Sequence, residues 1–116
     1  MRAVICDYVR TPFHRAHRGE LAQVRPEDML NATVSEILDR TKIDVNDIED
    51  LRLGCAYPEG VQGLNLGRIA TYLPGLPNTI PGMTTNRLCG SSMQVAHSAA
   101  GAISIGSGEV FLTAGV

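Results

Sequence analysis

The fold of this chain is decided by one segment, Thr84-Thr85-Asn86-Arg87-Leu88-Cys89-Gly90-Ser91-Ser92-Met93-Gln94. A short apolar run, residues 80–84, leads into it and predicts a strand. The run that leaves it, residues 88–108, contains no Asp, Glu, Lys or Arg. Its small and apolar residues recur at helical spacing, at Ala96, Ala99, Ala100 and Ile103. Cys89 is therefore predicted to lie at a strand-to-helix turn, with Ser91 and Ser92 in the first helical turn.

This position gives Cys89 two interpretations. A helix N-terminus carries about half a positive charge, which favours a thiolate, and the thiolate is the nucleophilic form of cysteine. Unpaired backbone N–H groups at the same place can bind the oxyanion that forms when sulfur attacks a carbonyl. Burial as a structural cysteine is the alternative, because free cysteines are among the most buried residues. Position alone leaves nucleophile and structural cysteine both open.

The remaining pattern alternates strands with helices. Strands are predicted at 3–8, 51–56, 80–84 and 110–114, and Cys6 and Cys55 are expected to be structural residues inside the first two. One amphipathic helix starts at Pro26, and a second covers 64–73 and stops at Leu73-Pro74-Gly75. Gly106-Ser107-Gly108 should end the helix that follows Cys89, which we expect to be covered on most sides. This order predicts an α/β fold with a largely parallel sheet.

Composition indicates an ordinary soluble domain. The chain has 116 residues, 44% hydrophobic and 19% charged, with a formal net charge of −2. Aromatic residues make up only 4%, so neither stacking platforms nor a basic surface for nucleic acid are expected. Polar residues interrupt the uncharged run, which argues against a membrane span. An acidic cluster at 44–50 lacks the order of a calcium loop, and no metal is expected. An odd number of cysteines, three, indicates a reducing compartment, and we expect a cytoplasmic protein.

The residues around Cys89 favour the nucleophilic over the structural interpretation of this cysteine. Asn86-Arg87-Leu88-Cys89-Gly90-Ser91-Ser92-Met93-Gln94 resembles the acyl-enzyme signature of the thiolase family, in the variant of degradative 3-ketoacyl-CoA thiolases and acetyl-CoA acetyltransferases. Three further pieces carry the resemblance: Arg10-Thr11-Pro12-Phe13, Gly54-Cys55, and Gln62-Gly63-Leu64-Asn65-Leu66-Gly67-Arg68. The chain departs from the family pattern at Thr85, at Val95-Ala96, and at His14, where the family usually has a glycine.

The resemblance implies a specific architecture. Family members consist of two similar α/β halves in a five-layered αβαβα body, and residues 1–116 would form the βαβαβαβ part of the N-terminal half. We therefore expect an incomplete N-terminal thiolase domain, with the C-terminal half absent. On the same analogy Asn65 and Arg68 support the catalytic loop, and a capped helix start with a surface Arg is the alternative. The resemblance also implies a homodimer or homotetramer.

The chain offers no evident base for Cys89. His97 is eight residues further along the same helix, about 12 Å away at 1.5 Å per residue, and we expect it to pack in a helix interface. His14 and His17 lie on a loop after the first predicted strand; geometry does not exclude them as the base, but nothing in their spacing marks them as catalytic. The basic run around them is more often a solvated face than an anion site. The resemblance implies that a His, a second Cys and an Asn from the second half supply the missing groups. We therefore expect the 116-residue chain alone not to turn over substrate.

The implied chemistry is acyl transfer. Cys89 would attack a 3-ketoacyl-CoA, release acetyl-CoA and hold the shortened acyl group as a thioester until CoA removes it, or run the reverse Claisen condensation. Its backbone N–H would be an oxyanion donor. Coenzyme A would be a substrate, and no cofactor is expected. A ketosynthase is a weaker alternative, since the residues around Cys89 differ. The non-enzyme alternative is a subunit or fragment that completes a thiolase-like fold with another chain.

Overall fold

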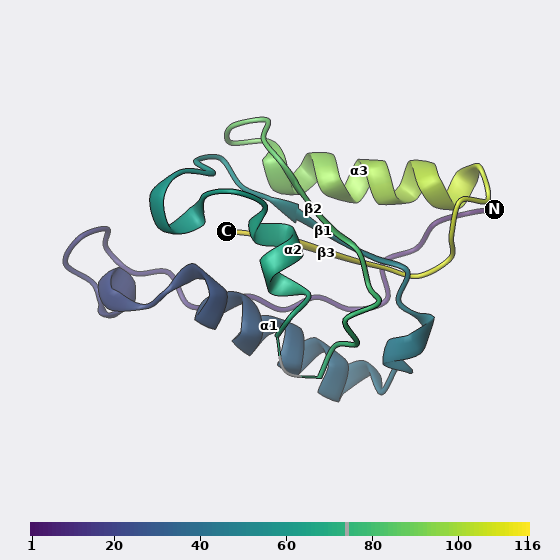
Figure 1. Cartoon of the computed structure of the whole chain (residues 1–116), viewed down its shortest axis with the longest axis horizontal. Helices are drawn as coiled ribbons and strands as arrows, with labels where there is room; N and C mark the ends of the chain where they lie inside the picture. Colours follow the sequence, from purple (N-terminus) through teal and green to yellow (C-terminus); the bar gives the residue numbers. More distant parts are fainter. Residues whose placement is uncertain (74) are drawn as a thin grey trace.

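The sheet has three parallel strands in the order β2-β1-β3, with β1 at Asp50–Gly54, β2 at Gly82–Thr85 and β3 at Phe111–Gly115 (Figure 1). Leu51 of β1 pairs with Gly82 on one side and with Leu112 on the other. Parallel neighbours need crossover connections, which the intervening helices provide. The computed structural model describes residues 1–73 and 75–116, and Pro74 of the predicted helix stop lies outside them. The expected α/β class with parallel strands is confirmed.

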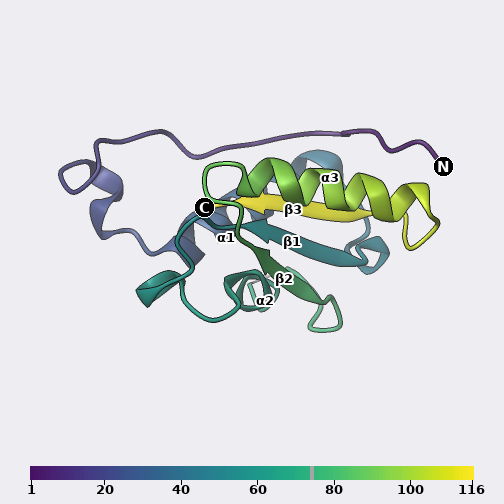
Figure 2. The same cartoon turned by 90° about the horizontal axis from the view of Figure 1, so that it is seen from above.

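Helices cover both faces of this sheet. Helices α1 (Pro26–Thr41) and α2 (Leu66–Ala70) lie on one face, and α3 (Ser91–Ser104) lies on the other (Figures 1 and 2). Strand β1 alternates accordingly: Leu51 and Leu53 are fully buried, whereas the Arg52 side chain reaches Ser98 of α3. The main core cluster consists of Leu30, Ile48, Leu51, Leu53, Leu66, Ala70 and Ile80.

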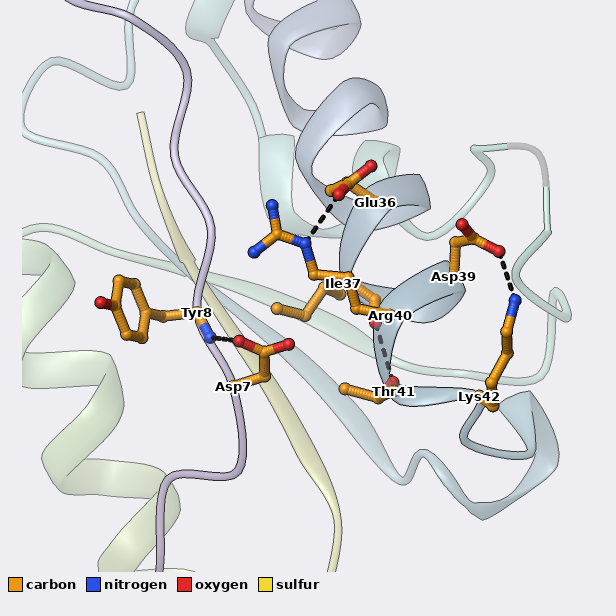
Figure 3. Close-up of polar contacts among 8 residues, drawn as sticks. All are labelled: Asp7, Tyr8, Glu36, Ile37, Asp39, Arg40, Thr41 and Lys42. Atoms are coloured by element: carbon orange, nitrogen blue, oxygen red, sulfur yellow. Dashed lines mark hydrogen bonds and ion pairs between the residues drawn. The ribbon is translucent and has the colours of Figure 1, made fainter.

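Helix α1 begins and ends where the sequence indicates. Pro26 occupies the first helical turn, where its missing N–H costs nothing. Lys42 follows the helix in a left-handed conformation (φ 53°), and its N–H donates to the Leu38 carbonyl. Figure 3 shows the exposed pairs of the last turns, Glu36 with Arg40 and Asp39 with Lys42. Short 3₁₀ turns lie at Glu20–Gln23, Val45–Asp47 and Gly60–Gln62.

The predicted N-terminal strand is wrong in this structure. Residues 3–8 are assigned to no strand, and no backbone hydrogen bond joins them to the sheet among the described residues. Their apolar side chains are open to solvent, with Ile5 85% and Tyr8 82% exposed, and Cys6 is exposed rather than structural. The segment runs along the outside of the molecule and passes beside the end of α1, near Arg40 (Figures 2 and 3). An extended segment becomes a strand only where its backbone hydrogen-bonds a neighbouring strand, and residues 3–8 make no such bond although β3 is an edge strand.

The extents of α2 and β2 and the cover of α3 also differ from expectation. Helix α2 spans five residues instead of ten. It starts late because Leu64 adopts a left-handed φ of 59° and Asn65 caps the helix, and after Ala70 the N–H groups of residues 71–73 donate three residues back, as in a 3₁₀ turn. Strand β2 starts at Gly82, two residues late, since Pro81 has no N–H for a ladder. Helix α3 is covered on one side only, and Met93 and Ile105 are exposed. Its end at Ser104, followed by Gly106 with φ 74°, agrees with the predicted stop.

Candidate active site

The turn that carries Cys89 connects β2 to α3, as predicted. β2 ends at Thr85 and α3 begins at Ser91, so Cys89 lies two residues before the helix. Gly90 occupies the N-cap position and provides no side-chain cap. The α3 macrodipole therefore ends in a first turn whose N–H groups receive no capping side chain, directly beside Cys89. This is a position that favours an anion.

Hydrogen bonds fix the shape of this turn. The Asn86 Oδ1 accepts from the Leu88 N–H at 2.8 Å, and the Arg87 carbonyl accepts from the Gly90 N–H at 3.0 Å. The Leu88 carbonyl accepts from the Ser91 N–H at 3.1 Å. Leu88 itself is left-handed, with φ 46°. A non-glycine residue there costs on the order of 1 kcal/mol, which the surrounding bonds must offset.

Cys89 differs from its neighbours in the turn. The N–H groups of Arg87, Leu88, Gly90 and Ser91 all donate to protein acceptors, whereas within residues 1–73 and 75–116 the Cys89 N–H has no acceptor. The Cys89 residue is exposed. A thiol open to solvent therefore stands next to a backbone donor that is free to bind a developing oxyanion. The structural interpretation of Cys89 predicts burial, and Cys89 is exposed in this structure.

The two other cysteines occupy contrasting environments. Cys55 follows β1 and is fully buried, which agrees with its predicted place in the core. Cys6 is exposed on the unpaired N-terminal segment. All three thiols are free. The chain thus carries one core thiol, one thiol on an extended segment and one at a helix start.

Asn65 and Thr84 join α2 to the strand that leads to Cys89. The Asn65 Oδ1 accepts from the Arg68 N–H at 3.1 Å and from the Thr84 hydroxyl at 2.9 Å, and its Nδ2 donates to the Gly82 carbonyl at 3.0 Å. The Thr84 Oγ1 also accepts from the Gly67 N–H at 2.8 Å. Because the Asn65 amide caps α2 and also hydrogen-bonds two residues of β2, it fixes the position of the helix relative to the strand. The sequence suggested the cap, but the link through Thr84 depends on side-chain direction and was missed.

Arg68 supports the approach to β2 from the same helix. Its guanidinium donates to the carbonyls of Ile80 and Asn78, at 2.5 and 3.3 Å, and stacks over the Tyr72 ring at 4.6 Å. The segment just before the strand is thereby tied to α2. Asn65 and Arg68 thus hold β2 and the segment before it, and their support of the Cys89 turn itself stays a prediction.

The histidines do not reach Cys89. His14 accepts from the Glu20 N–H at 3.3 Å within its own loop, and His17 lies in the same loop at a left-handed φ of 65°. That loop lies apart from the turn before α3 in both views (Figures 1 and 2). His97 is on α3 and is exposed, so its predicted packing in a helix interface is wrong here. Among the described residues, no histidine hydrogen-bonds Cys89.

The acidic residues of 44–50 accept hydrogen bonds from backbone N–H groups and from a neighbouring guanidinium. Asp44 accepts from the Asn46 N–H, Glu49 accepts from the Val110 N–H at 3.1 Å, and Asp50 pairs with Arg52 at 2.8 Å. In the part of the chain that the structure describes, no three His, Cys, Asp or Glu are grouped to hold a metal ion. Nor does any described helix combine the length and apolarity needed to cross a membrane.

Comparison with known proteins identifies the family. The model of the thiolase N-terminal domain matches residues 3–116. The chain is 44% identical over 114 residues to a 3-ketoacyl-CoA thiolase of Aeromonas salmonicida (strain A449) and 42% identical over 113 residues to one of Acinetobacter baumannii (strain AYE). It is therefore a member of the thiolase family, a family of acyltransferases. These alignments cover 97% of this chain but only 30% and 29% of the two relatives.

Proposed function

We propose that Cys89 is the acyl-accepting nucleophile of a thiolase and that the protein containing this chain cleaves 3-ketoacyl-CoA. The observation that supports this most is the combination of an exposed Cys89 thiol, a Cys89 N–H without an acceptor and the uncapped start of α3. Relatives that match almost the whole chain are named 3-ketoacyl-CoA thiolases.

The proposed reaction balances in two steps. The Cys89 thiolate attacks C3 of the 3-ketoacyl-CoA, and the carbonyl oxygen becomes an oxyanion beside the Cys89 N–H. Collapse of that oxyanion breaks the C2–C3 bond, and C2 takes the electron pair and a proton to leave as acetyl-CoA. The shortened acyl group stays on Cys89 as a thioester. Attack by the thiolate of free CoA then releases the shortened acyl-CoA and restores the Cys89 thiolate.

The described residues provide the nucleophile and one oxyanion donor, and no base hydrogen-bonds Cys89. Proton transfer to C2 and from the CoA thiol is therefore assigned to groups from outside residues 1–116. Coenzyme A is proposed as a substrate. A homodimer or homotetramer in a reducing, cytoplasmic compartment is proposed for the complete protein.

The test is acetylation followed by peptide mass mapping. The chain is incubated with acetyl-CoA, and acetyl incorporation is measured separately at Cys89, Cys6 and Cys55. We expect Cys89 to be acetylated well ahead of Cys6, although both are exposed, and we expect Cys89→Ser to remove the adduct while Cys6→Ser retains it. Equal labelling of Cys6 and Cys89 would contradict the assignment.

A second candidate, a subunit that completes a thiolase-like fold with another chain, is favoured by one observation. The apolar residues Val4, Ile5 and Tyr8 are exposed on an unpaired segment, and β3 pairs on one side only among the described strands. Sedimentation over a range of concentrations tests it. Self-association or capture of a chain with the remaining thiolase segments would support this candidate, and a stable monomer at all concentrations would count against it.

A further inference from the structure

The Ser91 hydroxyl closes the turn around Cys89. Ser91 is 3% exposed, and its Oγ accepts from the Arg87 N–H at 2.8 Å while donating to the Leu88 carbonyl at 2.6 Å. One side chain thus joins the start of α3 to two residues on the strand side of the turn. Cys89 lies in the loop of chain between these points. A buried hydroxyl with both bonds satisfied is a rigid link.

This link is not a helix cap. A capping side chain lies at the N-cap and accepts from N–H groups further into the helix. Ser91 is the first helical residue, and its hydroxyl bonds backward, to residues that precede the helix. The two bonds instead hold Leu88 in its left-handed conformation and keep the Arg87 N–H occupied. They determine where the Cys89 thiol and the Cys89 N–H lie relative to α3.

We infer that Ser91 is a positioning residue for Cys89, whose hydroxyl holds the 87–90 turn so that thiol and N–H project together at the start of α3. The inference rests on the proposed role of Cys89 as nucleophile. Without the hydroxyl, the Arg87 N–H loses its acceptor and the Leu88 carbonyl loses one of its two donors. The thiol then samples positions away from the helix N-terminus, and its attack on an electrophile slows.

The three cysteines allow a test within single molecules. The chain is treated with iodoacetamide, and the alkylation rate of each cysteine is followed by peptide mass spectrometry. Cys6, on the exposed extended segment, is the reference for a free thiol, and buried Cys55 reports loss of the fold. The Cys89 to Cys6 rate ratio then measures the environment of Cys89 alone. Amide hydrogen exchange at Arg87 reports the turn directly.

Ser91→Ala should lower the Cys89 to Cys6 ratio about three- to tenfold, the range expected for one hydrogen bond of ordinary net strength. It should also speed exchange of the Arg87 amide while Cys55 stays protected. Ser91→Thr, which keeps the hydroxyl, should restore the ratio. Ser98→Ala is the matched control: Ser98 is on the same helix and also makes two hydrogen bonds, to the Val95 carbonyl and from Arg52. It should leave the ratio unchanged.

An unchanged ratio in Ser91→Ala with Cys55 protected would overturn the inference, and so would an equal loss in Ser98→Ala. If Ser91→Ala exposes Cys55, the test passes to Ser91→Thr: a wild-type ratio supports the inference, and a low ratio with a protected Cys55 overturns it. Because alkylation involves no CoA, these outcomes are separate from the acetylation test. Cys89 can fail to accept an acetyl group while Ser91 still controls its alkylation.

Discussion

Gly54, the last residue of β1, lies directly against Ser91, the first residue of α3. A Cβ placed on Gly54 would stand 2.4 Å from the Ser91 carbonyl carbon and 2.4 Å from the Ser92 nitrogen. These are backbone atoms, so no side chain can move aside. The central strand of the sheet and the helix behind Cys89 therefore meet at a point that admits only glycine.

Gly54→Ala should displace the start of α3 and destabilise the fold by about 1–3 kcal/mol, the usual cost of overpacking. Urea unfolding measures the loss. Gly101→Ala is the matched control, because Gly101 is inside α3 and a Cβ there would contact nothing within 4 Å. It should stabilise by about 0.5–1 kcal/mol, since alanine favours a helix interior over glycine. Destabilisation of the same size in both variants would contradict the close packing at Gly54.

Asn65→Ala should cost about 1–2 kcal/mol, because it removes the helix cap together with the bonds to Thr84 and Gly82. Asn65→Asp keeps the acceptor for the Arg68 N–H and the Thr84 hydroxyl but not the donor to the Gly82 carbonyl. We expect an intermediate loss in the free energy of unfolding. If the Asp variant is as unstable as the Ala variant, the acceptor oxygen is not what holds α2.

Arg52→Ala should cost about 2–3 kcal/mol, because it leaves the half-buried Asp50 carboxylate without its partner. The guanidinium also donates to Ser98 and stacks over the Phe111 ring at 4.6 Å. Adding Asp50→Asn to that variant should recover part of the loss. Arg40→Ala, which breaks the exposed pair with Glu36, should lower the free energy of unfolding by less than about 1 kcal/mol. Urea unfolding measures all of these variants.

The Arg25 side chain hydrogen-bonds Glu27 and holds the pKa of that carboxyl below its ordinary value. A carboxyl with a lowered folded pKa stabilises the fold above its unfolded pKa, and this contribution is lost as pH falls through the folded pKa. Glu27→Gln should therefore be less stable than the wild type at pH 7 and equal to it once the carboxyl is protonated in both states. Urea unfolding along a pH series measures the difference.

Arg25→Ala is the control for that series. In its background the pH-dependent effect of Glu27→Gln should be smaller, because the largest cause of the lowered pKa is gone and only the backbone hydrogen bond of Glu27 still lowers it. If the loss of stability in Glu27→Gln does not vary with pH, it is caused by altered packing and not by loss of the ion pair with Arg25.

Local signals predicted most of the elements correctly. Pro26 marks the start of α1, Gly106 follows the end of α3, and the uncharged run after Cys89 places that residue at the strand-to-helix turn. Each of these signals acts within a few residues of chain. The turn position of Cys89 could be predicted for the same reason.

Features that depend on distant neighbours could not be predicted. Residues 3–8 have the composition of a strand, but whether they pair depends on how the segment is placed relative to an edge of the sheet, and here they form no hydrogen bonds to it. The exposure of His97 depends on what covers the outer face of α3. The backward direction of the Ser91 hydroxyl and the close approach of Gly54 depend on χ angles and on packing, about which spacing says nothing.

The strand order also governs how the chain folds. β1 pairs with β2 and with β3, and the latter contact joins residues 50–54 to residues 111–115. Loop closure over such a separation is slow compared with helix formation, because its entropy is lost before any contact is gained. Before β3 has paired, Arg52 lacks its contact with Phe111, and α3 lacks one of the strands on which it packs. β1 is the first of the three strands to be synthesised, yet it gains its second pairing partner only after β3 has been synthesised.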